Sequence, residues 1–93
     1  MRMAYVRNTG ELVNLDEFTL IKKKIGFFES DSLYYKKGYG FLRYNYDLGD
    51  EVCFKIDDYD AALWCARNKV RVSGLFDHCF KDGVFAPPDD DDD

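Results

Sequence analysis

The chain has 93 residues, of which 46% are hydrophobic and 33% are charged, and its formal net charge is −5. This composition is too apolar for an intrinsically disordered chain, and the length suits a single compact core. No stretch approaches the ~20 apolar residues of a membrane span, and the first residues lack the apolar region of a signal peptide. The sequence therefore predicts an intracellular protein of the cytoplasm or nucleus that does not bind membranes.

Period-2 alternation of β-branched and aromatic residues dominates the chain and predicts strands. The predicted strands are residues 5–15, 18–23, 25–35, 51–57 and 69–73. The alternation is clearest in the fourth strand, where it places Val52, Phe54 and Ile56 on one face. Residues 60–67 favour a helical turn because alanine and leucine have high helix propensity. Five strands with short connections predict an all-β fold, a small five-stranded antiparallel barrel of the OB type, with an SH3-like barrel as the second choice.

Residues 33–46 interleave tyrosines with lysines and glycines and are expected to form the long connection between the third and fourth strands. Aromatic rings stack on bases at ~1 to 3 kcal/mol each, and cations track phosphates, so the segment suits a single-stranded nucleic acid. A second interpretation is that the tyrosines cap the barrel and the lysines are solvated loop charges.

The chain ends in Pro87 and Pro88 followed by five aspartates, which cannot pack into a core. We therefore expect one domain over residues 1–86 and an acidic, disordered tail over residues 87–93. A run of this kind is typical of a linker to a further domain, or of a tag remnant. It could also fold back over basic residues of the first half.

Charge is unevenly distributed along the chain. Residues 1–43 hold eight Lys or Arg and five Asp or Glu, whereas residues 44–93 hold five and thirteen. Such asymmetry is typical of proteins with charged partners.

Four segments of the chain follow one another in the order of a known family pattern: Gly10 to Val13, Phe18 to Ile21, Ile25 to Phe28, and LGDEVCFKI at 48–56. With Ala66 to Val72, this order resembles a cold-shock domain, and in style the divergent cold-shock-like modules attached to Armitage-type RNA helicases. The resemblance covers roughly residues 5–74. It implies an OB-fold barrel that binds single-stranded RNA.

No arrangement of residues indicates catalysis. The single histidine, His78, is not accompanied by a nucleophile motif, and the chain lacks a glycine-rich phosphate loop. Cys53, Cys65 and Cys79 lack the spacing of a zinc site or a disulfide framework, so we expect reduced thiols. The sequence thus predicts a non-enzymatic protein without metal, cofactor or small-molecule substrate.

Two functions remain open. The first is a nucleic-acid-binding module, for single-stranded RNA, that forms the N-terminal domain of a larger protein. The second is a protein-interaction module, either an adaptor or a viral inhibitor that mimics nucleic acid. For the first, aromatic residues would stack on bases and cations would contact phosphates. The predicted binding residues are Phe18, Lys22, Lys23, Phe27, Tyr34, Tyr35, Lys36, Lys37, Tyr39 and Arg43.

Overall fold

The computed structural model describes residues 1–47, 50–70, 80–81 and 84–85. The chain divides into two units, Met1–Ile56 and Asp57–Asp93, and each is described by itself. The predicted boundary between residues 86 and 87 lies outside the described residues, so the single domain over 1–86 stays a prediction.

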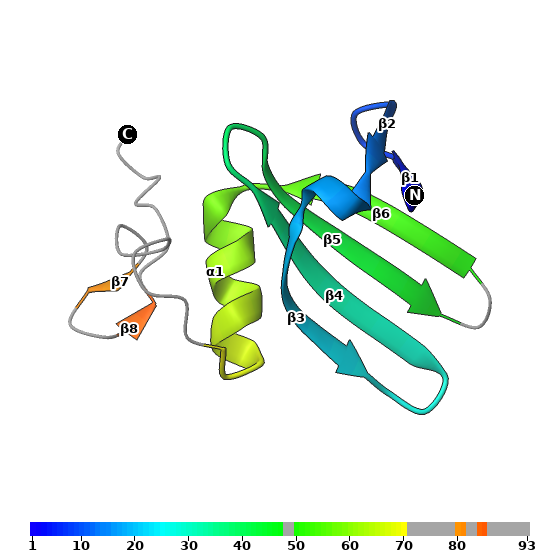
Figure 1. The fold of residues 1–93 in the computed structure, drawn as a ribbon. Coiled ribbons are helices and arrows are strands. Elements are labelled where there is room, and N and C mark those ends of the chain that lie inside the picture. Colours follow the sequence, from blue (N-terminus) through cyan, green and yellow to red (C-terminus); the bar gives the residue numbers. More distant parts are fainter. Residues whose placement is uncertain (48–49, 71–79, 82–83, 86–93) are drawn as a thin grey trace. The chain divides into compact units, whose positions relative to one another are not determined.

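The first unit is a six-stranded sheet with the strand order β2-β1-β6-β5-β4-β3. The four strands from β3 to β6 are consecutive antiparallel neighbours, and they lie side by side in Figure 1. A short 3-10 helix, η1 (Leu15–Glu17), joins β2 to β3. The strands are β1 (Met3–Val6), β2 (Glu11–Asn14), β3 (Thr19–Ile25), β4 (Glu29–Lys36), β5 (Gly40–Asp47) and β6 (Asp50–Ile56).

The unit is mostly β, as predicted, but closure into a five-stranded antiparallel barrel is not confirmed. Within the described residues β2 and β3 each pair on one side only, so the sheet is open. It is also not wholly antiparallel, because Val6 of β1 pairs in parallel with Cys53 of β6. The extra strand arises because the predicted strand 5–15 contains a turn, with Gly10 at φ +77°.

The connection from β2 to β3 requires the sheet to coil. Asn14 ends β2 and Thr19 begins β3, and this length of chain spans at most about 18 Å. The two edges of a flat six-stranded sheet would be about 24 Å apart. The two edges must therefore approach one another across one face.

The tyrosine-rich segment 33–46 was wrongly predicted to be a connection, because it forms the second half of β4, most of β5 and the tight turn between them. Gly38 and Gly40 have φ of +89° and +121°, which glycine adopts readily. We expected these glycines in a long loop, but they lie at the turn that joins β4 to β5.

The hydrophobic core cluster of the first unit lies on one face of the sheet, which we call the core face. Its buried members are Ala4, Val6, Leu15, Tyr34, Leu42 and Cys53, and Val13, Phe18, Tyr39 and Tyr44 pack against them. The alternation predicted for β6 exists, since Val52, Phe54 and Ile56 share the opposite face, but it is Cys53 that enters this cluster. Both faces of β6 carry apolar residues, so alternation alone did not identify the core face.

In the second unit, α1 (Asp58–Arg67) confirms the helical interpretation of residues 60–67. The Asp57 side chain caps the helix by accepting a hydrogen bond from the Asp60 N–H at 2.8 Å. Lys69 follows with φ +57° and is not in a strand, so the strand predicted at 69–73 is wrong at its start. Residues 71–73 lie outside the described residues. Two short strands, β7 (Phe80–Lys81) and β8 (Val84–Phe85), form a separate antiparallel pair.

Candidate functional site

Three of the ten predicted binding residues have structural roles instead. Tyr34 is buried in the core, and its hydroxyl accepts a hydrogen bond from Arg2 Nη1 at 3.1 Å. Tyr35 is half-buried, and its ring centroid lies 4.8 Å from that of Phe41. Arg43 donates to both carboxylate oxygens of Asp31, at 3.1 and 2.8 Å. A buried ring cannot stack on a base without leaving the core, and a guanidinium held by two hydrogen bonds already has a charged partner. Nucleic-acid contact by Tyr34 and Arg43 stays a prediction, and neither residue is part of the candidate site described below.

Phe18, Lys36 and Tyr39 form a compact cluster beside the core. The Phe18 and Tyr39 rings meet edge to face at 5.4 Å, a favourable aromatic geometry. The Lys36 ammonium lies 5.7 Å from the Phe18 ring centroid and 2.9 Å from a carboxylate oxygen of Glu17. Lys36 and the two rings therefore already have interaction partners within the chain.

A hollow of about 320 Å³ opens next to this cluster. Its lining residues are Met3, Leu12, Val13, Asn14, Glu17, Phe18, Lys36 and Tyr39. The Tyr39 hydroxyl donates to Glu11 at 2.6 Å, and burial together with this bond raises the pKa of Tyr39 to about 12. Tyr39 is therefore neutral at physiological pH.

Lys22, Lys23 and Phe27 lie together on the hairpin of β3 and β4. Lys24 and Phe28 belong to the same region, and we call these five residues the hairpin surface. Phe27 is 90% exposed and Phe28 65% exposed, with ring centroids 4.3 Å apart. The three lysines are exposed, and none forms an ion pair within the part of the chain that the structure describes. Lys37, in the turn after β4, is exposed but lies on a different hairpin.

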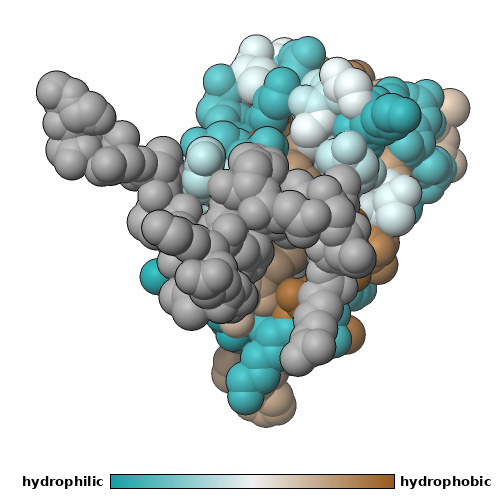
Figure 2. All heavy atoms as spheres, turned by 90° about the vertical axis from the view of Figure 1, so that its left-hand side faces the viewer, coloured by the Kyte–Doolittle hydropathy of each residue, from teal (hydrophilic) through white to brown (hydrophobic). Residues whose placement is uncertain are grey.

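Ile25 and Tyr46 extend the hairpin surface and were not predicted as site residues. Register places Ile25 opposite Ser30 and Ser30 opposite Tyr46, so all three share the core face. Ile25 is 73% exposed, and Tyr46 is exposed as well. The adjacency of Phe27 and Phe28 was a usable signal of exposure, because in the predicted strand 25–35 neighbouring residues would point to opposite faces and one of the two rings would leave the buried face. Figure 2 shows hydrophobic residues reaching the described surface among hydrophilic ones.

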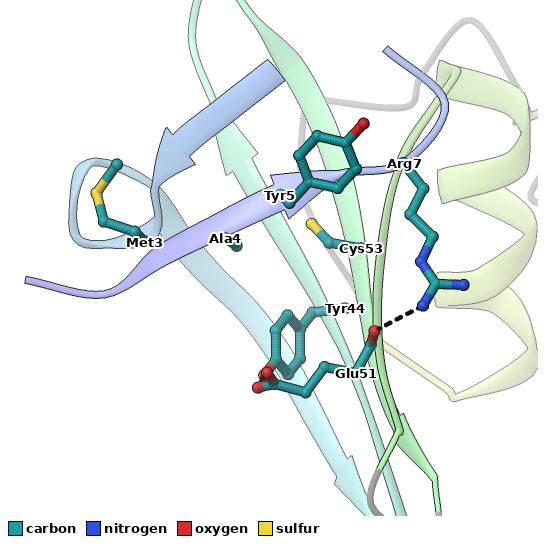
Figure 3. Close-up of a pocket in the computed structure, with 7 residues that line it drawn as sticks. All are labelled: Met3, Ala4, Tyr5, Arg7, Tyr44, Glu51 and Cys53. Carbon is teal, nitrogen blue, oxygen red and sulfur yellow. Dashed lines mark hydrogen bonds between the residues drawn. The ribbon is translucent and has the colours of Figure 1, made fainter. Parts of the chain in front are cut away.

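A second cavity, of about 210 Å³, lies where β1 and β6 separate (Figure 3). The two strands pair only at Val6 and Cys53. The part of β1 that precedes Val6 diverges from β6, and its residues Met3, Ala4 and Tyr5 line the cavity. In Figure 3 the side chains of Tyr44 and Glu51 point toward one another, and Arg7 donates to the Glu51 carbonyl oxygen at 3.4 Å.

Electrostatics in this cavity keep its groups unreactive near neutral pH. Burial raises the pKa of the Cys53 thiol to about 11, so little thiolate forms. Burial and the hydrogen bond to Glu51 raise the pKa of Tyr44 to about 12. The cavity is also smaller than the ~300 Å³ at which ligand sites usually begin. It is therefore a weaker candidate site than the hairpin surface.

The described residues contain no group of three or more potential metal ligands placed to hold an ion. Among these residues, no helix combines the length and the apolar character that crossing a membrane requires. Comparisons with protein families, with curated proteins and with solved structures found no match to this chain.

Proposed function

We propose that this protein is a non-catalytic module that binds single-stranded nucleic acid, with RNA as the first ligand to test, through the hairpin surface. The observation that carries the proposal is the coincidence, on one open edge, of three uncompensated lysines with two neighbouring exposed phenylalanines. Residues engaged in the core or in ion pairs play no part in it.

The lysines supply the electrostatic part of binding. Lys22 and Lys24 lie opposite Leu33 and Asp31 on one face of the sheet, and Lys23 lies opposite Ser32 on the other. Asp31 is held by Arg43, so its charge is shared with the guanidinium. Three cations along one edge strand offer phosphate contacts on both sides of that edge.

The phenylalanines supply the stacking part. A ring that is 90% exposed, like that of Phe27, gains little from the protein core. Stacking a base on such a ring is worth about 1–3 kcal/mol and is tolerant of sequence. The hairpin surface therefore favours unpaired bases with little sequence preference.

The test is fluorescence anisotropy of labelled single-stranded RNA and DNA at several salt concentrations. Three phosphate contacts predict that log affinity falls with log salt at a slope near about −2. A Lys22→Gln, Lys23→Gln and Lys24→Gln variant should bind weakly and lose most of that slope. Lys37→Gln is the matched control, since it removes an exposed lysine from another hairpin, and it should bind nearly as the parent does.

A Phe27→Ala and Phe28→Ala variant tests stacking separately. We expect a loss of at least about fivefold in affinity with the salt slope unchanged, since one stacked base is worth about 1–3 kcal/mol. Absence of binding by the parent protein at low salt would overturn the proposed function.

A protein-docking module is the second candidate function. The observation that favours it is that β3 is a seven-residue strand with one side unpaired within the described residues. Its lysines and its register irregularity oppose the addition of most strands, but a strand with carboxylates opposite Lys22 to Lys24 can join this edge by main-chain hydrogen bonding. A partner at this edge should survive Phe27→Ala and Phe28→Ala, whereas nucleic acid should not.

A further inference from the structure

The two open edges of the sheet differ in how they are protected against pairing. At β3 the edge has a register irregularity between Leu20 and Lys22 and three consecutive lysines, both of which oppose strand addition. At β2 the register is uninterrupted, and the strand Glu-Leu-Val-Asn has no lysine or proline. The protective features of β2 are its shortness and the charge of Glu11, which need not face its own copy in a twofold pair. We therefore regard β2 as better suited than β3 to pairing with a second copy of the same strand.

Exposed apolar side chains gather at the β2 edge. Leu12 is 66% exposed and lies opposite Tyr5, which is 57% exposed. Met3, 47% exposed, joins Leu12 in lining the 320 Å³ hollow that runs beside this edge. Clusters of exposed apolar residues of this kind mark interaction surfaces.

The charged groups around the hollow interact with partners within the chain. Lys36 pairs with Glu17 at 2.9 Å, and Glu11 accepts a hydrogen bond from the Tyr39 hydroxyl. The Lys55 ammonium lies 4.4 Å from the Tyr39 ring centroid. A partner at this edge needs no net charge of its own, in contrast to a ligand of the lysine-rich edge.

Main-chain geometry shows which groups of β2 are available for pairing. The Leu15 N–H donates to the Arg2 carbonyl oxygen at 2.8 Å, and the ladder continues through Ala4 and Val13. Because hydrogen-bonding direction alternates along an antiparallel strand, the main-chain groups of Leu12 face away from β1.

We propose that β2 pairs with β2 of a second copy of this chain in a closed twofold dimer. A twofold axis perpendicular to the sheet at Leu12 places Leu12 opposite Leu12 of the second copy and Glu11 opposite Val13. No like charges meet in this register. The same operation at β3 would bring lysines together, which is unfavourable. A twofold contact is closed, so assembly stops at the dimer.

The test is sedimentation equilibrium of the full chain from about 10 µM to about 1 mM, a range that detects weak association. We expect a monomer–dimer equilibrium that strengthens with added salt, because each copy carries a formal charge of −5. Leu12→Lys and Leu12→Glu place like charges opposite one another and should each weaken the dimer at least about tenfold.

The matched control is Leu20→Lys, which adds the same charge to another exposed leucine, on the β3 edge, and should leave the dimer unchanged. A chain that stays monomeric at every concentration overturns the proposal, and so does a dimer that survives both Leu12 variants. Species larger than a dimer contradict the closed twofold contact. Nucleic-acid binding is measured separately, so its failure would leave this result intact.

Discussion

Tyr34 and Phe27 are both aromatic residues within three positions of a lysine, yet they occupy opposite environments. Tyr34 lies in the core with a hydrogen bond from Arg2, and Phe27 lies at a hairpin tip in contact with Phe28. Both positions have lysines and a second aromatic residue close by in the sequence, so local composition does not distinguish the core residue from the exposed one. Burial decides which of the two can meet a ligand.

This difference predicts that alanine substitution affects stability very differently at the two positions. Tyr34→Ala should lower the free energy of unfolding by about 3–5 kcal/mol, because it leaves a cavity in the core. Phe27→Ala should change it by less than about 0.5 kcal/mol, because an exposed ring contributes little to stability. Urea unfolding of both variants measures the difference. Equal losses would contradict the placement of one residue in the core and the other at the surface.

At the scale of elements, the ends of β4, β5 and β6 bring like charges together. Glu29 lies opposite Asp47, and Asp47 lies opposite Asp50. Carboxylates directly opposite one another in a sheet repel. Arg7 offsets part of this repulsion, with its guanidinium 3.6 Å from Asp50.

Asp47→Asn should therefore raise the free energy of unfolding by about 0.2–1 kcal/mol, and the gain should shrink as salt is added. Asp31→Asn is the matched control, because it removes a carboxylate that accepts two hydrogen bonds from Arg43 and should destabilise the sheet. Thermal unfolding at low and high salt measures both effects. The same sign for the two variants would contradict the argument.

The elements that the sequence predicted well are those defined by local pattern. Strand β6 was predicted within one residue because alternation and a preceding glycine mark it, and α1 was anticipated from its alanines. Most of β4 lies within the predicted strand 25–35, but β5 was missed because tyrosine and lysine interleaving fits a binding loop as well as a strand. The pairing of β1 with β6 joins residues 6 and 53, and no local pattern encodes such a contact.

Local sequence patterns also explain why only some residues of the candidate site could be chosen from the sequence. Lys22, Lys23 and Phe27 could be chosen from sequence because residue type alone marks them as cationic or aromatic. Whether a cation is compensated depends on a neighbouring strand, as with Arg43 and Asp31, which are twelve positions apart. Sequence patterns therefore identified candidate residues but could not sort exposed ones from engaged ones.

At the scale of the whole molecule, the sheet of the first unit has two open edges of different chemistry. The β3 edge has three lysines without an ion pair among the described residues, and we propose that it binds a polyanion. The β2 edge carries a single charged side chain, Glu11, beside exposed apolar residues, and we propose that it pairs with another copy of the chain. Added salt should weaken binding at the first edge and strengthen it at the second. The two proposed interactions are therefore separable by salt concentration alone.

The single pairing of Val6 with Cys53 also has a consequence for the order of folding. Strands β3 to β6 form consecutive hairpins with short loop closures, whereas the β1 and β2 hairpin reaches the sheet only after a long loop has closed. Leu42→Ala should therefore slow folding, with a φ-value of about 0.5–0.8, and Val6→Ala should mainly speed unfolding, with a φ-value of about 0–0.3. Stopped-flow chevron analysis would reveal the reverse order if the N-terminal hairpin belonged to the folding nucleus. In the expected order, β1 and β2 are the strands of this sheet that are synthesised first and the strands that join it last.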